Sequence, residues 1–311
     1  MLDSPPTPTA EVTAYLSSLP ELPPVWEPPL DARRRECATQ VHQDSGVPQP
    51  IESVTEVNAA GVSARLYRPG SSSEGLLVWL HGGGWVLGDV ASFDPLARAL
   101  ANGAGCAVLS VDYRLAPEHP FPAALEDSWA ALQWATSYFS KIAVGGDSAG
   151  GNLAAVTALR ARDSGLKLAL QLLVYPVLEY GIDSAAYRAF ASRYDGFAGC
   201  EGYGSEFHSM MRWMWEQYVP DRALRVDPQA APIRADSLGG LPPTLVLTAE
   251  HDIFRQENEA YAQRLIEQGV QADILAYPGQ IHGFFHLIGR LEDSRRAVAQ
   301  SAKALRAALL R

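Results

Sequence analysis

The stretch Gly146-Asp147-Ser148-Ala149-Gly150 combines residue types that could do nucleophilic chemistry. A short apolar run, Ile142–Val144, precedes it, and a segment of helical character, Leu153–Arg162, follows it. Between a strand and a helix, a G-x-S-x-G motif forms a nucleophile elbow, a sharp turn that exposes the serine hydroxyl at the carboxyl edge of a sheet. Glycine is required on both sides because a Cβ would collide with the adjoining strand and helix. The alternative is a plain glycine-rich turn, and the rest of the chain must decide between them.

An acid and a base follow the serine in the order that such an elbow needs. A serine hydroxyl is a weak nucleophile at neutral pH and requires a base that is itself oriented by a carboxylate. Asp252 comes after the predicted strand Thr244–Thr248, and His282 comes after the predicted strand Ile274–Tyr277. Ligands of open α/β sheets bind at the carboxyl ends of the strands. We therefore expect Ser148, Asp252 and His282 to meet there as nucleophile, acid and base.

Three neighbouring residues compete for these roles. Glu250 lies two residues before Asp252 and is the alternative acid. His286 lies four residues after His282 and could share its helix face, but it lacks the position at a strand end. His251 precedes the carboxylate, which favours a structural role.

A glycine run supplies the second requirement of acyl transfer, donors for the oxygen that becomes negative. His81-Gly82-Gly83-Gly84 follows the predicted strand Leu76–Leu80 and is a loop of the HGGG type. We expect the backbone N–H groups of Gly83, Gly84 and Ala149 to form the oxyanion hole. The chain has neither a phosphate-binding glycine loop nor an H-E-x-x-H motif, so the sequence predicts no cofactor and no metal.

Apolar periodicity predicts an α/β fold with a mostly parallel sheet covered by helices on both faces. The predicted strands are a hairpin over 54–67 and the segments Leu76–Leu80, Ala107–Val111, Ile142–Val144, Leu170–Tyr175, Thr244–Thr248 and Ile274–Tyr277. The predicted helices are Ala10–Leu19, Leu30–Gln43, a helix around Leu125–Leu132, Leu153–Arg162, Gln256–Gln268 and Leu291–Leu310.

Two regions could cover a site at the sheet edge. Residues 1–45 are proline-rich and are predicted as an N-terminal cap arm, with ordinary packing as the alternative. Residues 46–311 form the predicted catalytic domain, and its segment of about 180–235 is an aromatic-rich insertion without strand character. Some of these aromatic side chains should touch substrate, while others form a satellite core. The predicted pocket residues are Trp85, Asp147, Trp213, Tyr218, Phe254 and Phe284.

Composition narrows the class of protein. A net charge of −10 argues against a nucleic-acid partner, and the densest basic run, Arg33-Arg34-Arg35, is expected to be a solvated helix face. The three cysteines lack metal or disulfide spacing, which favours a reducing compartment. The N-terminus has no signal-peptide pattern, and no apolar run is long enough to span a membrane. The sequence therefore predicts a cytoplasmic protein.

Four motifs together resemble the hormone-sensitive-lipase-like (family IV) bacterial esterases of the α/β-hydrolase superfamily. They are His81–Trp85, Asp112-Tyr113-Arg114-Leu115-Ala116-Pro117-Glu118, Gly146–Asn152 and His282-Gly283-Phe284. The resemblance implies an α/β-hydrolase fold with a helical cap, the triad Ser148, Asp252 and His282, action on short- to medium-chain acyl esters, and a possible homodimer.

The chain departs from the family pattern in two places. The chain reads Asp252-Ile253-Phe254 where the family has Asp-Pro-Leu, so Phe254 could reshape the pocket near His282. The segment Phe197–Phe207 is also unusually rich in glycine. An amidase or lactonase with the same triad is an alternative to the esterase. A non-catalytic small-molecule receptor on the same fold is the other, because a fold does not dictate a function.

Overall fold

The computed structural model describes residues 7–20, 23–70, 74–185, 187–188 and 203–310. In these residues eight strands form one sheet, in the order β1-β2-β4-β3-β5-β6-β7-β8. Only β2 runs antiparallel to its described neighbours, β1 and β4, and β3 to β8 are parallel to one another. The predicted hairpin and the mostly parallel sheet are thus confirmed. The strands are β1 (Ser53–Ala59), β2 (Val62–Arg68), β3 (Gly75–Leu80), β4 (Ala107–Val111), β5 (Lys141–Asp147), β6 (Leu170–Val174), β7 (Thr244–His251) and β8 (Ala272–Ile281).

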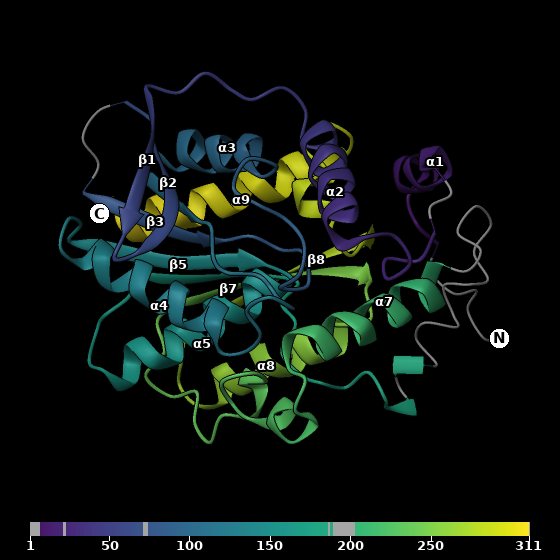
Figure 1. The fold of residues 1–311 in the computed structure, drawn as a ribbon. Helices are drawn as coiled ribbons and strands as arrows, with labels where there is room; N and C mark the ends of the chain where they lie inside the picture. Colours follow the sequence, from purple (N-terminus) through teal and green to yellow (C-terminus); the bar gives the residue numbers. More distant parts are fainter. Residues whose placement is uncertain (1–6, 21–22, 71–73, 186, 189–202, 311) are drawn as a thin grey trace.

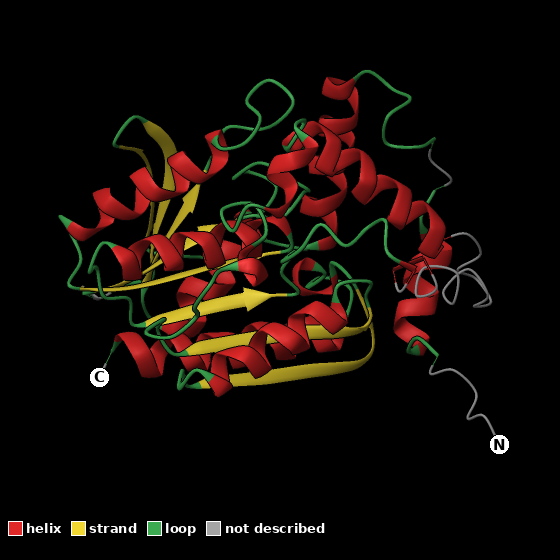
Figure 2. Ribbon diagram, turned by 90° about the horizontal axis from the view of Figure 1, so that it is seen from below, coloured by secondary structure: helices red, strands yellow, loops and turns green. Residues whose placement is uncertain are grey.

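Helices cover both faces of this sheet, so its central strands are buried and mostly apolar. One face carries α3 (Asp94–Ala104) and α9 (Glu292–Leu309), and the other carries α4 (Ala123–Thr136), α5 (Ala149–Asp163) and α8 (Arg255–Glu267) (Figures 1 and 2). Two separate apolar cores result, one under each helical layer.

The sequence analysis did not anticipate helix α3. Its buried face is made largely of alanine, with Leu96 and Leu100 as the only leucines. The helix ends at Gly105, which adopts the left-handed conformation with φ of 67°.

Three further helices lie at the end of the sheet where the parallel strands finish (Figure 1). They are α1 (Ala10–Ser18), α2 (Leu30–Asp44) and α7 (Tyr203–Tyr218). The predicted helices Ala10–Leu19 and Leu30–Gln43 each end within one residue of α1 and α2. The N–H of Thr9, just before α1, donates to the carbonyl of Gly279 in β8 at 3.1 Å, which joins the arm to the edge strand. Most of the glycine-rich segment 197–207 lies outside the described residues.

The expectation of a solvated basic face on α2 is wrong for two of its three arginines. Arg33 is only 6% exposed, because its guanidinium donates to the carbonyls of Pro23 and Pro24 and pairs with Glu36. The Nε of Arg34 donates to the carbonyl oxygen of Val86 at 2.9 Å, and its guanidinium pairs with Glu118 at 2.7 Å. Arg34 thus fastens α2 to the loops that follow β3 and β4, whereas Arg33 ties the helix to the segment before it. A helix with so narrow an apolar stripe needs such polar anchors.

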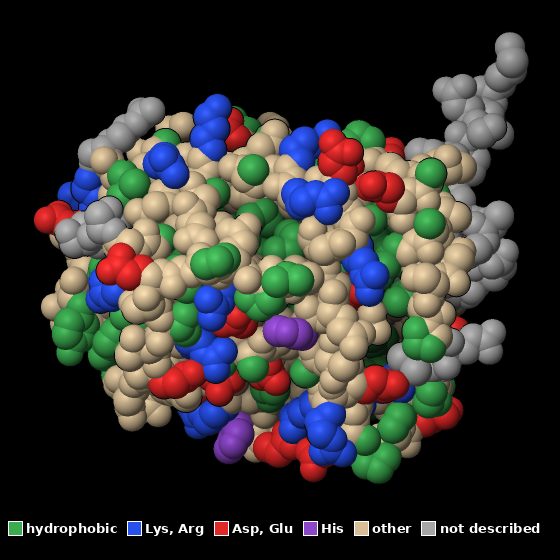
Figure 3. Space-filling view, turned by 90° about the horizontal axis from the view of Figure 1, so that it is seen from above, with side chains coloured by type: hydrophobic (Ala, Val, Ile, Leu, Met, Phe, Trp, Pro, Cys, Tyr) green, Lys and Arg blue, Asp and Glu red, His purple; other side chains and the backbone are tan. Residues whose placement is uncertain are grey.

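On the face seen from above, acidic and basic side chains of the described residues alternate rather than gather by sign (Figure 3). None of the helices in the described ranges has the length and apolar character needed to cross a bilayer.

Candidate active site

Ser148, Asp252 and His282 lie at the carboxyl ends of three strands of the parallel part of the sheet. Ser148 stands between β5 and α5, Asp252 directly follows β7, and His282 directly follows β8. Strands β5 to β8 are consecutive neighbours in the sheet, so their carboxyl ends share one edge. The structure therefore brings together three residues that are 104 and 30 positions apart in the sequence.

The turn at Ser148 has the geometry of a nucleophile elbow. Ser148 has φ of 55° and ψ of −119°, a conformation that an L-residue rarely adopts and that the surroundings must enforce. A Cβ on Gly150 would lie 1.9 Å from the carbonyl oxygen of Leu80, and one on Gly146 would lie 2.4 Å from the same oxygen. Both glycines are thus required because β3 passes against the turn.

A continuous hydrogen-bond chain joins the three side chains. His282 Nε2 lies 2.8 Å from Ser148 Oγ, and His282 Nδ1 lies 2.7 Å from Asp252 Oδ2. The other carboxylate oxygen of Asp252 accepts the N–H of Phe254 at 2.9 Å, which fixes the rotation of the carboxylate. This arrangement allows the imidazole to take the hydroxyl proton of Ser148 while Asp252 holds Nδ1–H.

Aromatic rings fix the plane of the His282 imidazole. The ring centroids of Tyr175, Phe207 and Phe254 lie 4.7, 4.9 and 5.3 Å from that of His282. Phe254 lies two residues after Asp252 and packs against His282, so the residue that departs from the family pattern contacts the histidine. The rings exclude water from the imidazole, which strengthens its hydrogen bonds.

The alternative acid and the two other histidines lie in different surroundings. A carboxylate oxygen of Glu250 accepts the N–H of Gly279 at 2.8 Å, so this group connects β7 to β8. His251 is buried on β7 at 2% exposure. His286 lines the same cavity as Ser148, and burial lowers its pKa to about 4, so its imidazole is neutral near pH 7.

The glycine loop after β3 presents unpaired donors next to the elbow. Gly83 has φ of 116° and Gly84 has φ of 59°, and a Cβ on Gly83 would lie 2.2 Å from the carbonyl oxygen of Leu87. The loop is closed by the N–H of Leu87, which donates to the carbonyl of Gly83 at 2.8 Å. Within the described part of the chain, the N–H groups of Gly83 and Gly84 donate to no acceptor. Ala149 opens α5, so its N–H has no acceptor within the helix.

Asp147 connects the elbow to the glycine loop. Its Oδ1 accepts the N–H of Gly82 at 2.9 Å, and its side chain lines the cavity beside Ser148. Burial raises the pKa of this carboxyl from 3.8 to about 7, although the Gly82 N–H and the charge of His282 act against that rise.

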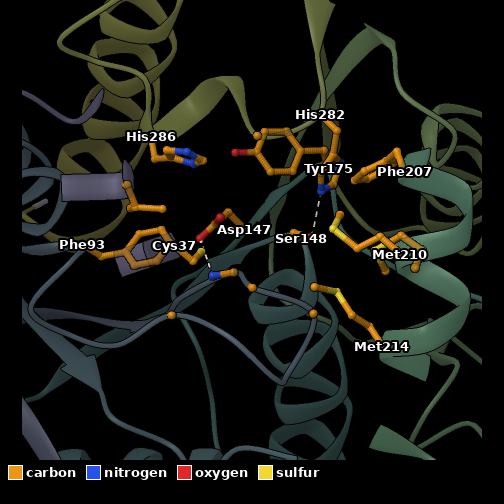
Figure 4. A pocket seen from close by; sticks show the side chains of 17 residues that line it. Cys37, Phe93, Asp147, Ser148, Tyr175, Phe207, Met210, Met214, His282 and His286 are labelled. Atoms are coloured by element: carbon orange, nitrogen blue, oxygen red, sulfur yellow. Dashed lines mark hydrogen bonds between the residues drawn. The ribbon is translucent and has the colours of Figure 1, made fainter. Parts of the chain in front are cut away.

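A small, largely apolar cavity of about 130 Å³ opens at Ser148. In Figure 4, Cys37, Phe93 and His286 lie on one side of Ser148, and Phe207, Met210 and Met214 lie on the other. The full lining consists of Cys37, Val41, Gly82, Gly83, Gly84, Gly88, Phe93, Asp147, Ser148, Tyr175, Phe207, Met210, Met211, Met214, His282, Gly283 and His286.

Of the six predicted pocket residues, Asp147 is in this lining and the other five are not. Trp85 and Tyr218 are fully buried against each other, with centroids 4.3 Å apart. Trp213 packs against the core, and the Phe284 ring packs at a tilt against the Tyr277 ring, with centroids 4.9 Å apart. Phe254 packs on the catalytic-site histidine from outside the cavity.

Sequence reasoning missed the methionines that form much of the wall. The chain has four methionines, and Met210, Met211 and Met214 all line the cavity from α7. The available signal in the sequence was that these methionines lie close together on one helix. Methionine side chains adapt to irregular apolar ligands, so such a cluster indicates a binding wall. Cys37 and Val41 of α2 were also missed, because their apolar stripe equally suits packing on the core.

The described residues contain no group of three or more histidine, cysteine, aspartate or glutamate side chains arranged to hold a metal ion. The polar groups around Ser148 are instead an imidazole, a carboxylate and backbone N–H groups.

Comparison with known proteins identifies the family of this chain. The profile of the alpha/beta hydrolase fold family matches residues 77–286. Over 283 residues the chain is 38% identical to the carboxylic ester hydrolase LipN of Mycobacterium tuberculosis, and the alignment covers 85% of this chain and 73% of LipN. It is 37% identical over 228 residues to an arylesterase of Saccharolobus solfataricus, covering 71% of this chain and 72% of the relative.

A solved structure agrees with these relatives. The hyperthermophilic esterase from the archaeon Pyrobaculum calidifontis matches with a TM-score of 0.85 and 36% sequence identity, covering 97% of this chain and 98% of that one. The chain therefore belongs to the alpha/beta hydrolase family, among its hormone-sensitive-lipase-like esterases.

Proposed function

We propose that this protein is a serine carboxylesterase that hydrolyses short- to medium-chain acyl esters through an acyl-enzyme intermediate. Ser148 Oγ attacks the ester carbonyl carbon while His282 Nε2 takes the hydroxyl proton. Asp252 stabilises the resulting imidazolium, and the N–H groups of Gly83, Gly84 and Ala149 stabilise the oxyanion. His282 then gives the proton to the alcohol as it leaves. Water, activated by the same histidine, attacks the acyl-serine carbonyl and releases the acid.

The observation that carries this proposal is the unbroken chain Ser148–His282–Asp252, with separations of 2.8 and 2.7 Å. It supports an enzyme over a receptor, since a receptor would need none of these proton-transfer contacts. Esterase relatives support ester over amide or lactone substrates. The small size and apolar lining of the cavity favour acyl groups of short to medium length. A homodimer and a cytoplasmic location remain predictions from the sequence.

Hydrolysis of p-nitrophenyl esters from acetate to palmitate, by the wild type and by Ser148→Ala, tests the proposal. We expect wild-type turnover that is fastest on short chains and is lost in the variant by at least about 10³-fold, because removal of the nucleophile leaves only binding and the oxyanion hole. Equal melting temperatures would show that the variant is folded. Substantial activity in a folded Ser148→Ala would refute the serine mechanism, and an inactive, folded wild type would refute the esterase.

A further inference from the structure

Helix α7 lies directly on the residue that is proposed to donate to the oxyanion. A Cβ placed on Gly84 would lie 1.8 Å from Met214 Sδ and 2.8 Å from Met214 Cγ. The thioether of Met214 therefore occupies the space above the Gly84 Cα, and this methionine is only 3% exposed. Because interiors are closely packed, any movement of Met214 is felt at Gly84.

The next residue of the loop is held by the same helix. The Trp85 ring stacks on the Tyr218 ring with centroids 4.3 Å apart and planes 8° apart. It also meets the Trp215 ring edge-on at 4.9 Å. All three rings are fully buried, and neither Trp85 nor Tyr218 lines the cavity, so their contacts are with each other rather than with substrate.

This part of the loop requires external support. Gly83, Gly84 and Trp85 are three consecutive residues with positive φ, at 116°, 59° and 60°. A non-glycine residue in that region is strained and persists only where its surroundings determine it. For Trp85, the rings of Trp215 and Tyr218 supply those surroundings. The C-terminal end of α7 is itself fixed, because the Tyr218 carbonyl accepts the N–H of Phe121 at 2.7 Å.

We propose that Met214, Trp215 and Tyr218 of α7 are positioning residues for the oxyanion hole, holding Gly84 and Trp85 so that the N–H groups of Gly83 and Gly84 point at the developing oxyanion. The same helix thus has two tasks. Its earlier turns, with Phe207 and Met210, form a wall of the cavity, and its last turns hold the donors. The inference rests on the proposed serine mechanism.

The substitution Tyr218→Leu tests this role. It removes the stacked ring behind Trp85 without changing any residue that lines the cavity. We expect kcat to fall about tenfold to a hundredfold, since a displacement of about 1 Å in a catalytic group has effects of that size. We expect KM to change less than about twofold, because donors aimed at the oxyanion act in the transition state and not on the bound ester.

Inhibitors separate positioning of the donors from general disruption. An alkyl trifluoromethyl ketone forms a tetrahedral adduct with an oxyanion, and its inhibition constant should rise by the same factor as kcat falls. The matching methyl ketone, a ground-state competitor, should bind Tyr218→Leu as it binds the wild type. Tyr218→Phe should restore kcat, because it keeps the ring and removes a hydroxyl that has no hydrogen-bond partner among the described residues.

Tyr261→Leu is the matched control. Tyr261 is equally buried and lies on α8, away from the loop, so its loss should lower the melting temperature and leave kcat unchanged. A folded Tyr218→Leu with wild-type kcat, or with only KM raised, would overturn the proposal. Should Tyr218→Leu not fold, Trp85→Phe makes a smaller change in the same stack and is judged by the same criteria.

The proposed serine mechanism is tested apart from this role of α7. Stoichiometric labelling of wild-type Ser148 by a phosphonate ester would establish the nucleophile whatever the α7 variants do. Failure of that labelling would refute the mechanism itself, whereas normal labelling with an unaffected Tyr218→Leu would refute the positioning role alone.

Discussion

Replacing Asp252 by asparagine should reverse the direction of the hydrogen bond that orients His282. Asp252 has two fixed partners, the N–H of Phe254 at Oδ1 and Nδ1 of His282 at Oδ2. An asparagine has one acceptor and one donor end. Its oxygen must face the Phe254 N–H, because the opposite rotation would bring two buried donors together at a cost of about 1–3 kcal/mol. The amide NH₂ then faces Nδ1.

This orientation gives His282 the wrong tautomer. Facing a donor, Nδ1 must be the acceptor, so the imidazole proton moves to Nε2. Nε2–H then points at Ser148 Oγ, 2.8 Å away, and can no longer take the hydroxyl proton. The corresponding change in a Ser-His-Asp protease lowers kcat by about 10⁴. We expect a similar loss here, which corresponds to about 5.5 kcal/mol in activation free energy.

Steady-state hydrolysis of p-nitrophenyl butyrate by Asp252→Asn measures this loss. Glu250→Gln is the matched control, because Glu250 is the other carboxylate near the end of β7 and accepts from Gly279 rather than from His282. We expect Glu250→Gln to retain kcat within about threefold. A folded Asp252→Asn with kcat within tenfold of the wild type would refute the tautomer argument, and a larger loss in Glu250→Gln would move the acid to Glu250.

Two further predictions concern the stability of the site. Gly150→Ala places a Cβ 1.9 Å from the Leu80 carbonyl oxygen and should lower the free energy of unfolding by about 3 kcal/mol. Gly165→Ala, at a residue with φ of 76° and no atom within 4 Å of the new Cβ, should lower it by only about 1 kcal/mol. Urea unfolding compares the two variants, and equal losses would contradict the steric argument. Burial raises the pKa of the Asp147 carboxyl from 3.8 in the unfolded chain to about 7 in the folded protein. The carboxyl therefore contributes most to the free energy of unfolding below about pH 4, where it is protonated in both states. This contribution is lost as the pH rises to about 7. Asp147→Asn should therefore gain stability relative to the wild type between pH 5 and 8, by at most on the order of 4 kcal/mol, and a pH-independent difference in urea midpoint would refute this.

The positions of the chemical groups could be predicted because they depend on strand ends. Short apolar runs mark the buried parallel strands, and the first polar residues after them must emerge at one sheet edge. Asp252 and His282 were located from these strand ends together with their order after Ser148, and Glu250 remained the alternative acid. The elbow glycines were equally predictable, since a sharp turn against β3 has no room for a Cβ.

The unusual roles of buried polar residues could not be predicted in the same way. Arg33 is buried because its guanidinium donates to the carbonyls of Pro23 and Pro24. The position of these carbonyls depends on the conformation of a loop, which no local sequence pattern predicts. Helix α3 was missed because most of its buried residues are small alanines, although a small side chain is what its close packing on α9 requires. One example is Gly103, where a Cβ would lie 2.8 Å from the Cβ of Ala302.

The wall of the cavity was the hardest part to predict, because it depends on the rotation of a single helix. Successive residues of an α-helix differ in direction by about 100°, so neighbours on α7 face different surroundings. Met214 faces the cavity, while Trp213 and Trp215 on either side of it pack elsewhere. Aromatic content alone suggested Trp213 as a pocket residue, whereas the rotation of the helix places Met214 at the cavity instead.

The same rotation limits how the substrate range of this enzyme could be altered. Phe207 and Met210 line the cavity from the first turns of α7, whereas Met214 also covers Gly84, and Tyr218 supports Trp85. If the last turns hold the oxyanion loop, their substitution changes the rate of acyl transfer for every ester. Substitution of Met210 should instead change the preference among esters, because it reshapes the wall while leaving both the support of the donors and the rings around His282 in place.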